Sequence, residues 1–496
     1  MANLTDNFSP LQEDVFIVAD PQANYGQYPY SPQKRHPELH DDCHGENSQY
    51  ADFTLAYDMV RDLFALMGLD KYHFGTDRWN PLGDLIKPGM RVLVKPNWVR
   101  EYNAGQSNDI ACMYTHTAVI RPVLDYIFKA LNGKGEVVIG DAPLQSSNFE
   151  KLLCENRMQE LASIFQNKGN HFEVRDFRLT LWGQTGELKG DPSGYTLIDL
   201  GENSLHTPKD NLTNLYRVAC YDPKEMNRHH APGRHEYLIC NTALQADIII
   251  NLPKLKTHKK TGFTGSLKNF VGTVGHKEYL PHHTKGDPQR GGDEYQNASF
   301  LNHIQGELLD IHFSESAARL KPLRMITGFS ISLIRKAMGR NNRQLVDGSW
   351  SGNDTLWRTI LDLNRILTYY SYNDKQMMDV PQRKILTIVD GIIAGEGDGP
   401  LAPTPKHIGV LLGGMDRVAI DSAIAGLIGF DEQKIPMVSK CFCIDRWPLT
   451  RHKDSSTIKI RTKFEDRVTN LKISQLPHLT LIPALGWMDC TINKNK

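Results

Sequence analysis

Short aliphatic runs recur along this chain and alternate with longer segments of helical periodicity. The runs Asp247–Leu252 and Lys384–Val389 show almost no polar alternation. Such strands are typical of a parallel sheet that is buried on both faces. The alternation of strand and helix favours an α/β fold, a mainly parallel doubly wound sheet with helices on both faces. We expect strands at Val15–Ala19, Arg91–Lys95, Glu136–Gly140, His171–Phe177, Asp247–Leu252, Lys384–Val389 and His407–Leu412, and helices at about Tyr50–Leu69, Thr117–Leu131, Phe149–Asn167, Leu356–Ser371 and Asp416–Ile428.

Three regions interrupt this alternation. Residues 1–48 are rich in Pro, Asn, Gln and His and predict an irregular N-terminal arm. Residues 178–236 are polar and turn-rich, and residues 275–380 become helical, which predicts a mostly helical insertion. The α/β domain is therefore expected in two parts, 49–274 and 381–450. A C-terminal strand (Leu479–Leu485) and tail are expected within residues 451–496.

Composition narrows the classes of partner. The 496 residues carry 57 Lys plus Arg and 57 Asp plus Glu, so the formal net charge is zero. A nucleic-acid or membrane-surface protein needs a basic excess, so neither partner is expected. The sequence has no apolar run of about 20 residues and no secretory leader, which predicts a cytoplasmic protein. None of the eight cysteines forms Cys-x-x-Cys, so we expect reduced thiols. Homo-oligomerisation stays open.

Two predicted strands end in side chains that could bind a ligand or take part in a reaction. In an open parallel sheet, ligands bind at the carboxyl ends of the strands. Lys95 follows three aliphatic positions, so it either extends to solvent or faces an anion, and Asn97 follows the next proline. Asp141 ends another aliphatic strand, where it could cap a helix, ligate a metal or act as a base.

A third strand end carries the largest number of candidate binding residues. Residues 253–269 are basic and rich in Gly and Thr, and a helix is expected to begin near Thr264. Backbone N–H groups at a helix start, with lysines nearby, form a site for phosphate or carboxylate. A solvated charged face is the alternative, and the Walker A order is absent. The residues of interest are Lys254, Lys256, His258, Thr264, Gly265, Lys268 and Asn269.

Carboxylates and glycines follow the next strand. Asp390, Glu396 and Asp398 could bind a hard cation or transfer protons, and Gly397 and Gly399 would permit close approach of a ligand. A Gly-rich turn with solvated carboxylates is the alternative. Asp421 lies in an apolar helical segment, where a carboxylate is either paired or functional.

Four histidines follow the basic segment. His276, His282, His283 and His303 stand in polar, turn-rich sequence, which favours exposed loop residues. Metal binding is the lesser alternative, because adjacent histidines are a weak signature without a third ligand.

Five of these motifs occur in one order and together resemble a known family. They are Lys95-Pro96-Asn97, Asn251 to His258, Thr264 to Asn269, Asp390-Gly391 with Glu396-Gly397 and Gly399-Pro400, and Ala419-Ile420-Asp421. They resemble the bacterial and archaeal family named domain of unknown function 362, over about Arg91 to Asp431, interrupted by the 275–380 insertion. The resemblance implies no established reaction. Many members resemble fusions with a ferredoxin-type module, but the missing Cys-x-x-Cys motif predicts no iron–sulfur cluster here.

Two functional hypotheses follow. The first is an enzyme that acts on an anionic small molecule, phosphorylated or carboxylated, either with or without a divalent metal. Its catalytic candidates are Lys256, His258, Asp390, Glu396 and Asp421, its substrate-binding candidates are Lys95, Asn97, Lys254, Thr264, Gly265, Lys268, Asn269, Gly397 and Gly399, and its metal-ligand candidates are Asp141, Asp390 and Asp398.

The second hypothesis is a non-catalytic protein that binds an anionic ligand or cofactor. Convergence of the carboxylates on the lysines would favour catalysis, and separation of the two sets would favour binding. A redox role rests on family analogy alone.

Overall fold

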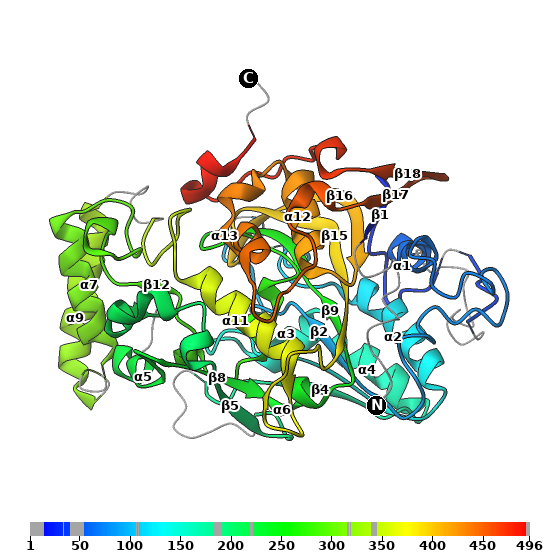
Figure 1. Ribbon diagram of the computed structural model, residues 1–496, viewed down its shortest axis with the longest axis horizontal. Coiled ribbons are helices and arrows are strands. Elements are labelled where there is room, and N and C mark those ends of the chain that lie inside the picture. Colours follow the sequence, from blue (N-terminus) through cyan, green and yellow to red (C-terminus); the bar gives the residue numbers. More distant parts are fainter. Residues whose placement is uncertain are drawn as a thin grey trace.

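One large mixed sheet organises the chain (Figure 1). The computed structural model describes residues 14–32, 34–39, 54–105, 107, 109–181, 190–218, 222–314, 317, 319–338 and 345–492. The strand order is β18-β17-β1-β16-β15-β9-β2-β3-β4, and β10 with β11 branches from β15. The strands are β1 (Val15–Ala19), β2 (Arg91–Pro96), β3 (Glu136–Asp141), β4 (Phe172–Asp176), β9 (Ile248–Leu252), β10 (Lys254–His258), β11 (Gly262–Thr264), β15 (Lys384–Asp398), β16 (Ala402–Gly414), β17 (Ile460–Phe464) and β18 (Arg467–Leu471).

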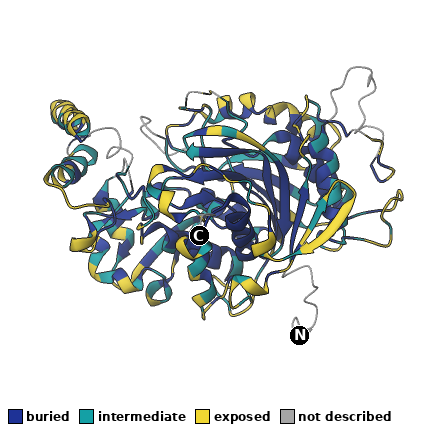
Figure 2. Cartoon of the chain, turned by 90° about the horizontal axis from the view of Figure 1, so that it is seen from above, coloured by how far each residue is buried: buried dark blue, intermediate teal, exposed yellow. Residues whose placement is uncertain are grey.

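The predicted fold class is confirmed, because helices cover both faces of this sheet and its middle is parallel. The neighbours β15, β9, β2, β3 and β4 all pair in parallel. Side chains alternate along β2: Val92 and Val94 pack with helices on one face, and Leu93 packs with helices on the other. The strands between the two layers are buried (Figure 2). The first face holds α1 (Leu55–Leu66), α2 (Thr117–Leu131), α3 (Phe149–Glu155) and α4 (Met158–Asn167), and the second holds α6 (Asn241–Gln245), α11 (Leu356–Tyr369), α12 (Arg417–Ile428) and α13 (Pro436–Ser439).

Two segments expected to be loops are strands. The basic segment continues as β10, turns, and returns as β11, so no α-helix begins at Thr264; residues Lys268–Thr273 form a short 3-10 helix instead. The Gly-rich segment continues β15 to Asp398 and pairs with β16. Its glycines allow close packing: a Cβ at Gly395 would lie 2.9 Å from Lys256 Cβ.

The C-terminal region also differs from the prediction. Leu479–Leu485 is not a strand; its backbone crosses α12, where Leu479 N donates to Leu427 O. The strands lie earlier, in β17 and β18, which sequence reasoning missed because β18 is exposed and polar. The predicted helix start at Tyr50, and Cys43 and Cys220, lie outside the described residues.

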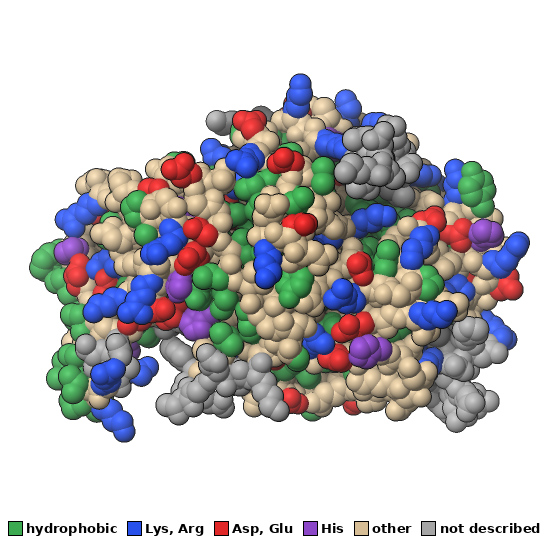
Figure 3. Space-filling model, turned by 60° about the horizontal axis from the view of Figure 1, so that its bottom comes forward, with side chains coloured by type: hydrophobic (Ala, Val, Ile, Leu, Met, Phe, Trp, Pro, Cys, Tyr) green, Lys and Arg blue, Asp and Glu red, His purple; other side chains and the backbone are tan. Residues whose placement is uncertain are grey.

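Parts of the regions 178–236 and 275–380 form smaller units beside the sheet. Residues 190–240 contain a three-stranded sheet of β5 (Tyr195–Asp199), β8 (Arg234–Cys240) and β7 (His230–Ala231), with α5 (Pro223–His229). Helices α7 (Phe300–Phe313) and α9 (Lys321–Ala337) protrude at one end, where α9 exposes Met325 and Phe329 (Figures 1 and 3). The remaining short strands are β6 (Tyr216–Arg217), β12 (His283–Thr284), β13 (Tyr370–Ser371) and β14 (Gln376–Met377). No helix in the described ranges is long and apolar enough to cross a membrane.

The described part of the N-terminal arm packs onto its own sheet through a buried ion pair. Lys254 Nζ lies 3.0 Å from Asp390 Oδ2, and both side chains are fully buried. Tyr25 Oη donates to Asp390 Oδ1 at 2.6 Å, and His116 N donates to Oδ2 at 3.0 Å. These contacts give Asp390 a structural role in joining the arm, the sheet and the start of α2.

Asp390→Asn should destabilise the fold by about 3 kcal/mol, because it leaves the buried Lys254 ammonium without its counter-charge. The matched control is Asp398→Asn, since Asp398 lies 3.6 Å from Lys259 in a partly exposed pair and should cost less than about 1 kcal/mol. Urea unfolding measures both. Equal losses in the two variants would contradict this role.

Candidate functional site

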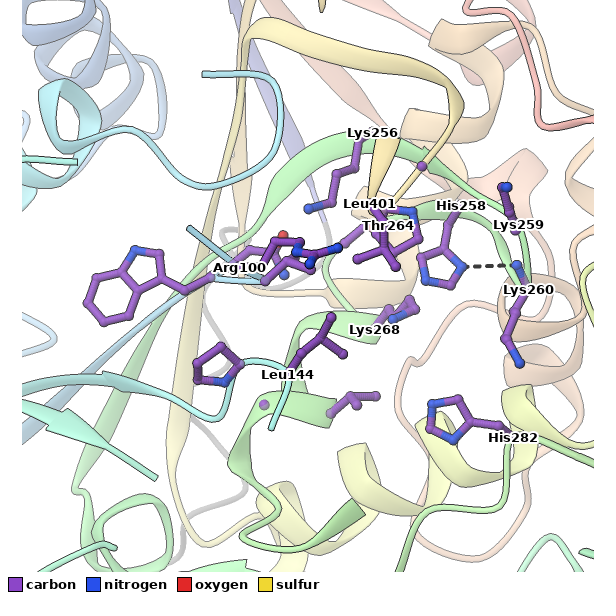
Figure 4. Close-up of a pocket in the computed structure, with 18 of the residues that line it drawn as sticks. Arg100, Leu144, Lys256, His258, Lys259, Lys260, Thr264, Lys268, His282 and Leu401 are labelled. Atoms are coloured by element: carbon purple, nitrogen blue, oxygen red, sulfur yellow. Dashed lines mark hydrogen bonds between the residues drawn. The ribbon is translucent and has the colours of Figure 1, made fainter. Parts of the chain in front are cut away.

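A cavity of about 520 Å³ opens at the carboxyl ends of β2 and β3 (Figure 4). Segments that are distant in sequence line it: the segment after β2 (97–100), the end of β3 with the residues that follow (141–146), the β10–β11 hairpin with the 3-10 helix that follows (256–272), and the β15–β16 turn (398–402). Val218, Lys277, His282, Asp347 and Ser349 complete the lining. The parallel register of β2 with β3 and β9 brings these strand ends to one edge.

Positive side chains dominate the cavity wall. The cations that line it are Arg100, Lys256, Lys259, Lys260, Lys268 and Lys277, and the carboxylates are Asp141, Asp347 and Asp398. Asp141 is already bound to the buried Lys95 at 2.8 Å, and Asp398 lies 3.6 Å from Lys259. Basic side chains therefore outnumber carboxylates around the cavity, although the whole chain has no formal net charge.

Lys268 is the most distinctive of these cations. It makes no hydrogen bond or ion pair with any residue that the structure describes, and part of its side chain is open to the cavity. Burial first, and then repulsion from Lys277 and Lys260, lowers the pKa of Lys268 to about 7. Burial also lowers the pKa of Lys277 to about 8, and Lys277 Nζ donates to Ala142 O at 2.9 Å.

The other polar groups of the hairpin fit a site for an anion. Lys256 Nζ donates to Met113 O, and burial together with the Lys268 charge places the pKa of Lys256 well below its ordinary value. His258 Nδ1 accepts from Lys260 N at 3.0 Å, and burial lowers the pKa of His258, so the ring is neutral. Thr264 Oγ1 is buried without a hydrogen-bond partner among the described residues, which leaves a hydroxyl free for a ligand.

Asp421 and Gly265 do not line the cavity but hold the segment that forms this part of its wall. The Asp421 carboxylate accepts from Ser266 N at 2.6 Å and from Leu267 N at 3.0 Å. A Cβ at Gly265 would lie 2.3 Å from Asp421 Oδ1, so only glycine permits the approach. Burial raises the pKa of Asp421 to about 7. Both residues shape the segment that carries Thr264 and Lys268.

The structure brings some predicted site residues together and separates others. Glu396 does not line the cavity, and its carboxylate accepts a hydrogen bond from Ile482 N at 3.0 Å. Lys95 does not line it either and is buried in an ion pair with Asp141. The cavity lining includes Asn97, Asp141, Lys256, His258, Thr264, Lys268, Asn269, Asp398 and Gly399, and excludes Lys95, Lys254, Gly265, Asp390, Glu396, Gly397 and Asp421. The carboxylates named as catalytic thus do not line the cavity with its lysines, and Asp390 pairs with Lys254 away from it. Asp141, Asp390 and Asp398 form no shared cation position among the described residues.

Sequence reasoning missed Arg100, Lys277 and His282 as cavity residues. His282 was expected to be exposed, yet it lines the cavity, and burial lowers its pKa to about 3. The expectation of an exposed loop is wrong for His283 too, whose side chain is 3% exposed. The missed residues lie in turns whose direction depends on distant contacts, such as Gly275 N donating to Leu238 O. A lysine three residues beyond the buried Val274 was the available signal for Lys277.

The family can now be assigned. The sequence matches the family described as Domain of unknown function (DUF362) over residues 92–186 and 210–426, which is more than half of the chain. The chain belongs to this family. The match confirms the resemblance drawn from the five motifs, and all the residues that line the cavity lie within the matched ranges.

Other comparisons add little to the DUF362 assignment. No curated protein matches the chain. A crystal structure of a Thermotoga maritima protein is 11% identical, with a TM-score of 0.30, over 70% of this chain and 54% of that one. The lactate racemase apoprotein from Thermoanaerobacterium thermosaccharolyticum is also 11% identical, with a TM-score of 0.29, over 73% of this chain and 52% of that one. This chain therefore spans about half the length of each structure.

Lys268→Met should stabilise the ligand-free protein by about 1 kcal/mol at pH 7, because it removes a cation that the fold does not neutralise. The pKa of Lys268 is lowered in the folded state, so between pH 7 and about 10 the unfolded chain binds more protons and wild-type stability rises with pH. The advantage of the variant should shrink over that range. Urea unfolding at pH 6.5, 8 and 9.5 tests this, and a destabilised variant at all three values would contradict it.

Proposed function

We propose that this protein binds an anionic small molecule, phosphorylated or carboxylated, in the lysine-lined cavity. The observation that carries the proposal is the side chain of Lys268, which has no hydrogen-bond or ion-pair partner among the described residues, on the same cavity wall as the unpartnered Thr264 hydroxyl (Figure 4). Burial of a cation costs free energy unless a counter-charge compensates it. An anion between these groups would supply that charge.

The dimensions and chemistry of the cavity support a small ligand. A volume of about 520 Å³ lies within the range of small-molecule sites in proteins. Apolar side chains, among them Leu144 and Leu401, line the cavity with the lysines (Figure 4). This mixture favours a ligand that has an apolar body and an anionic group.

Catalysis is a second candidate, favoured by one observation. A lysine with a pKa of about 7 can donate or accept a proton near neutral pH, as a general acid or base does. The positions of Asp390, Glu396 and Asp421 give no support to the direct roles predicted for them. The conclusion is therefore an anion-binding protein in which Lys268 is the cavity lysine with a pKa of about 7.

Sulfate tests the proposal without knowledge of the natural ligand, because it stays a dianion between pH 6 and 9. Calorimetric titration should show binding that weakens at least tenfold from pH 6.5 to 9, as Lys268 and Lys277 lose their protons. At pH 8, binding should take up protons, seen as heats that differ between buffers of different ionisation enthalpy.

Lys268→Met should weaken sulfate binding at least tenfold at pH 6.5 and remove most of its pH dependence. Lys134→Met is the matched control, since Lys134 is exposed and lies away from the cavity. Sulfate binding that is absent from wild type, or equally strong in both variants, would exclude this cavity as the anion site.

A further inference from the structure

A second cavity, of about 250 Å³, lies beside the first. Asp347 lines both cavities, and Lys260 Nζ donates to the Asp347 backbone carbonyl, which leaves the carboxylate uninvolved in that contact. His283 of β12 and Glu294 line the second cavity together with Asp347. The sequence had raised metal binding, as the lesser alternative, for His283 alone of these three residues.

These three side chains form a group of metal-ligating type. One ligand atom from each lies within 4.8 Å of the ligand atoms of the other two. His283 and Glu294 are each 3% exposed. His283 Nδ1 is buried and has no hydrogen-bond partner among the described residues, which is uncommon for a buried ring nitrogen.

The protonation states suit a cation. Burial, with Lys260, His282, Arg217 and Lys209 adding to it, lowers the pKa of His283, so its imidazole is neutral and able to act as a ligand. Burial and the neighbouring Asp347 and Asp310 carboxylates raise the pKa of Glu294 to about 7, opposed by the Gly286 N–H.

Three cations near the group have other partners, and Arg335 also lines this cavity. Arg217 pairs with Asp310 at 2.8 Å, and Lys209 pairs with Asp293 at 3.3 Å. Lys285 also pairs with Asp310, at 2.6 Å. Glu294 therefore has no protein cation paired with it among the described residues, and a bound cation would relieve its repulsion from Asp347.

Another group of this type provides a contrast. Glu136, His171 and Glu173 also bring ligand atoms within 4.8 Å of one another. His171 is largely exposed, and Arg175 lies 3.3 Å from Glu136 and 2.8 Å from Glu173. An arginine already neutralises these carboxylates, so the geometry there is that of a surface ion-pair cluster.

We propose that His283, Glu294 and Asp347 bind a divalent transition-metal ion. One imidazole and two carboxylates suit Zn²⁺ or Mn²⁺, and three protein ligands leave coordination positions open. Because Asp347 lies on the wall between the cavities, the ion would sit next to the anion site. This inference goes beyond the proposed function and does not depend on it, since the ion needs no anionic ligand.

Metal alone tests the site. Chelator-treated wild-type protein is titrated with Mn²⁺ without added anion, and free Mn²⁺ is followed by its electron paramagnetic resonance signal; Zn²⁺ competition follows. We expect one ion per chain. Glu294→Gln and Asp347→Asn should each weaken Mn²⁺ binding at least tenfold, while His171→Gln, from the contrasting cluster, should leave it unchanged.

Thermal unfolding separates loss of the site from loss of the fold. Mn²⁺ should raise the melting temperature of wild type and His171→Gln but not that of Asp347→Asn, whose ligand-free melting temperature should stay near that of wild type. Absence of Mn²⁺ and Zn²⁺ binding to wild type, or loss of binding in His171→Gln with retention in Asp347→Asn, would overturn the proposal. Failure of sulfate binding would leave it intact.

Discussion

Lysine ammonium groups that the fold takes out of water determine how the strand ends are built. Each needs a counter-charge or hydrogen-bond acceptor in place of water. Lys254 has Asp390, and Lys95 has Asp141. Lys256 has only a backbone carbonyl, and Lys268, which is partly open to the cavity, has no hydrogen-bond or ion-pair partner among the described residues. The first two lysines therefore hold the sheet and the N-terminal arm together, whereas the last two present unsatisfied charge to a cavity.

The lysines without a counter-charge explain why the cavity is expected to bind an anion. A cavity that contains uncompensated cations is costly for the free protein and favourable for an anion, so stability and binding oppose each other at Lys268. The motifs of this DUF362 protein divide in the same way. Some residues face the cavity, and others, such as Asp421 and Gly265, hold the wall in place from behind. A shared order of motifs thus includes both binding residues and positioning residues.

The sequence predicted the fold well because buried parallel strands have a strong aliphatic signal. Seven of the eight predicted strands are present, and α2 has its predicted bounds. Chemical roles were harder to predict. Asp390 and Asp398 stand eight positions apart on β15. Asp390 is buried in its ion pair with Lys254, whereas Asp398 lines the cavity. The direction of a carboxylate depends on partners hundreds of residues away, such as Tyr25 for Asp390. A single sequence does not reveal such partners.

The most direct test of the account is to locate a bound dianion. Crystals grown with selenate, which has the shape and charge of sulfate, allow the selenium to be located by its anomalous scattering. The account predicts a peak inside the large cavity, within hydrogen-bond reach of Lys268 Nζ and Thr264 Oγ1. The same peak should be missing from crystals of Lys268→Met. Selenate bound only on the outer surface, with the cavity empty in wild-type crystals, would contradict the central claim.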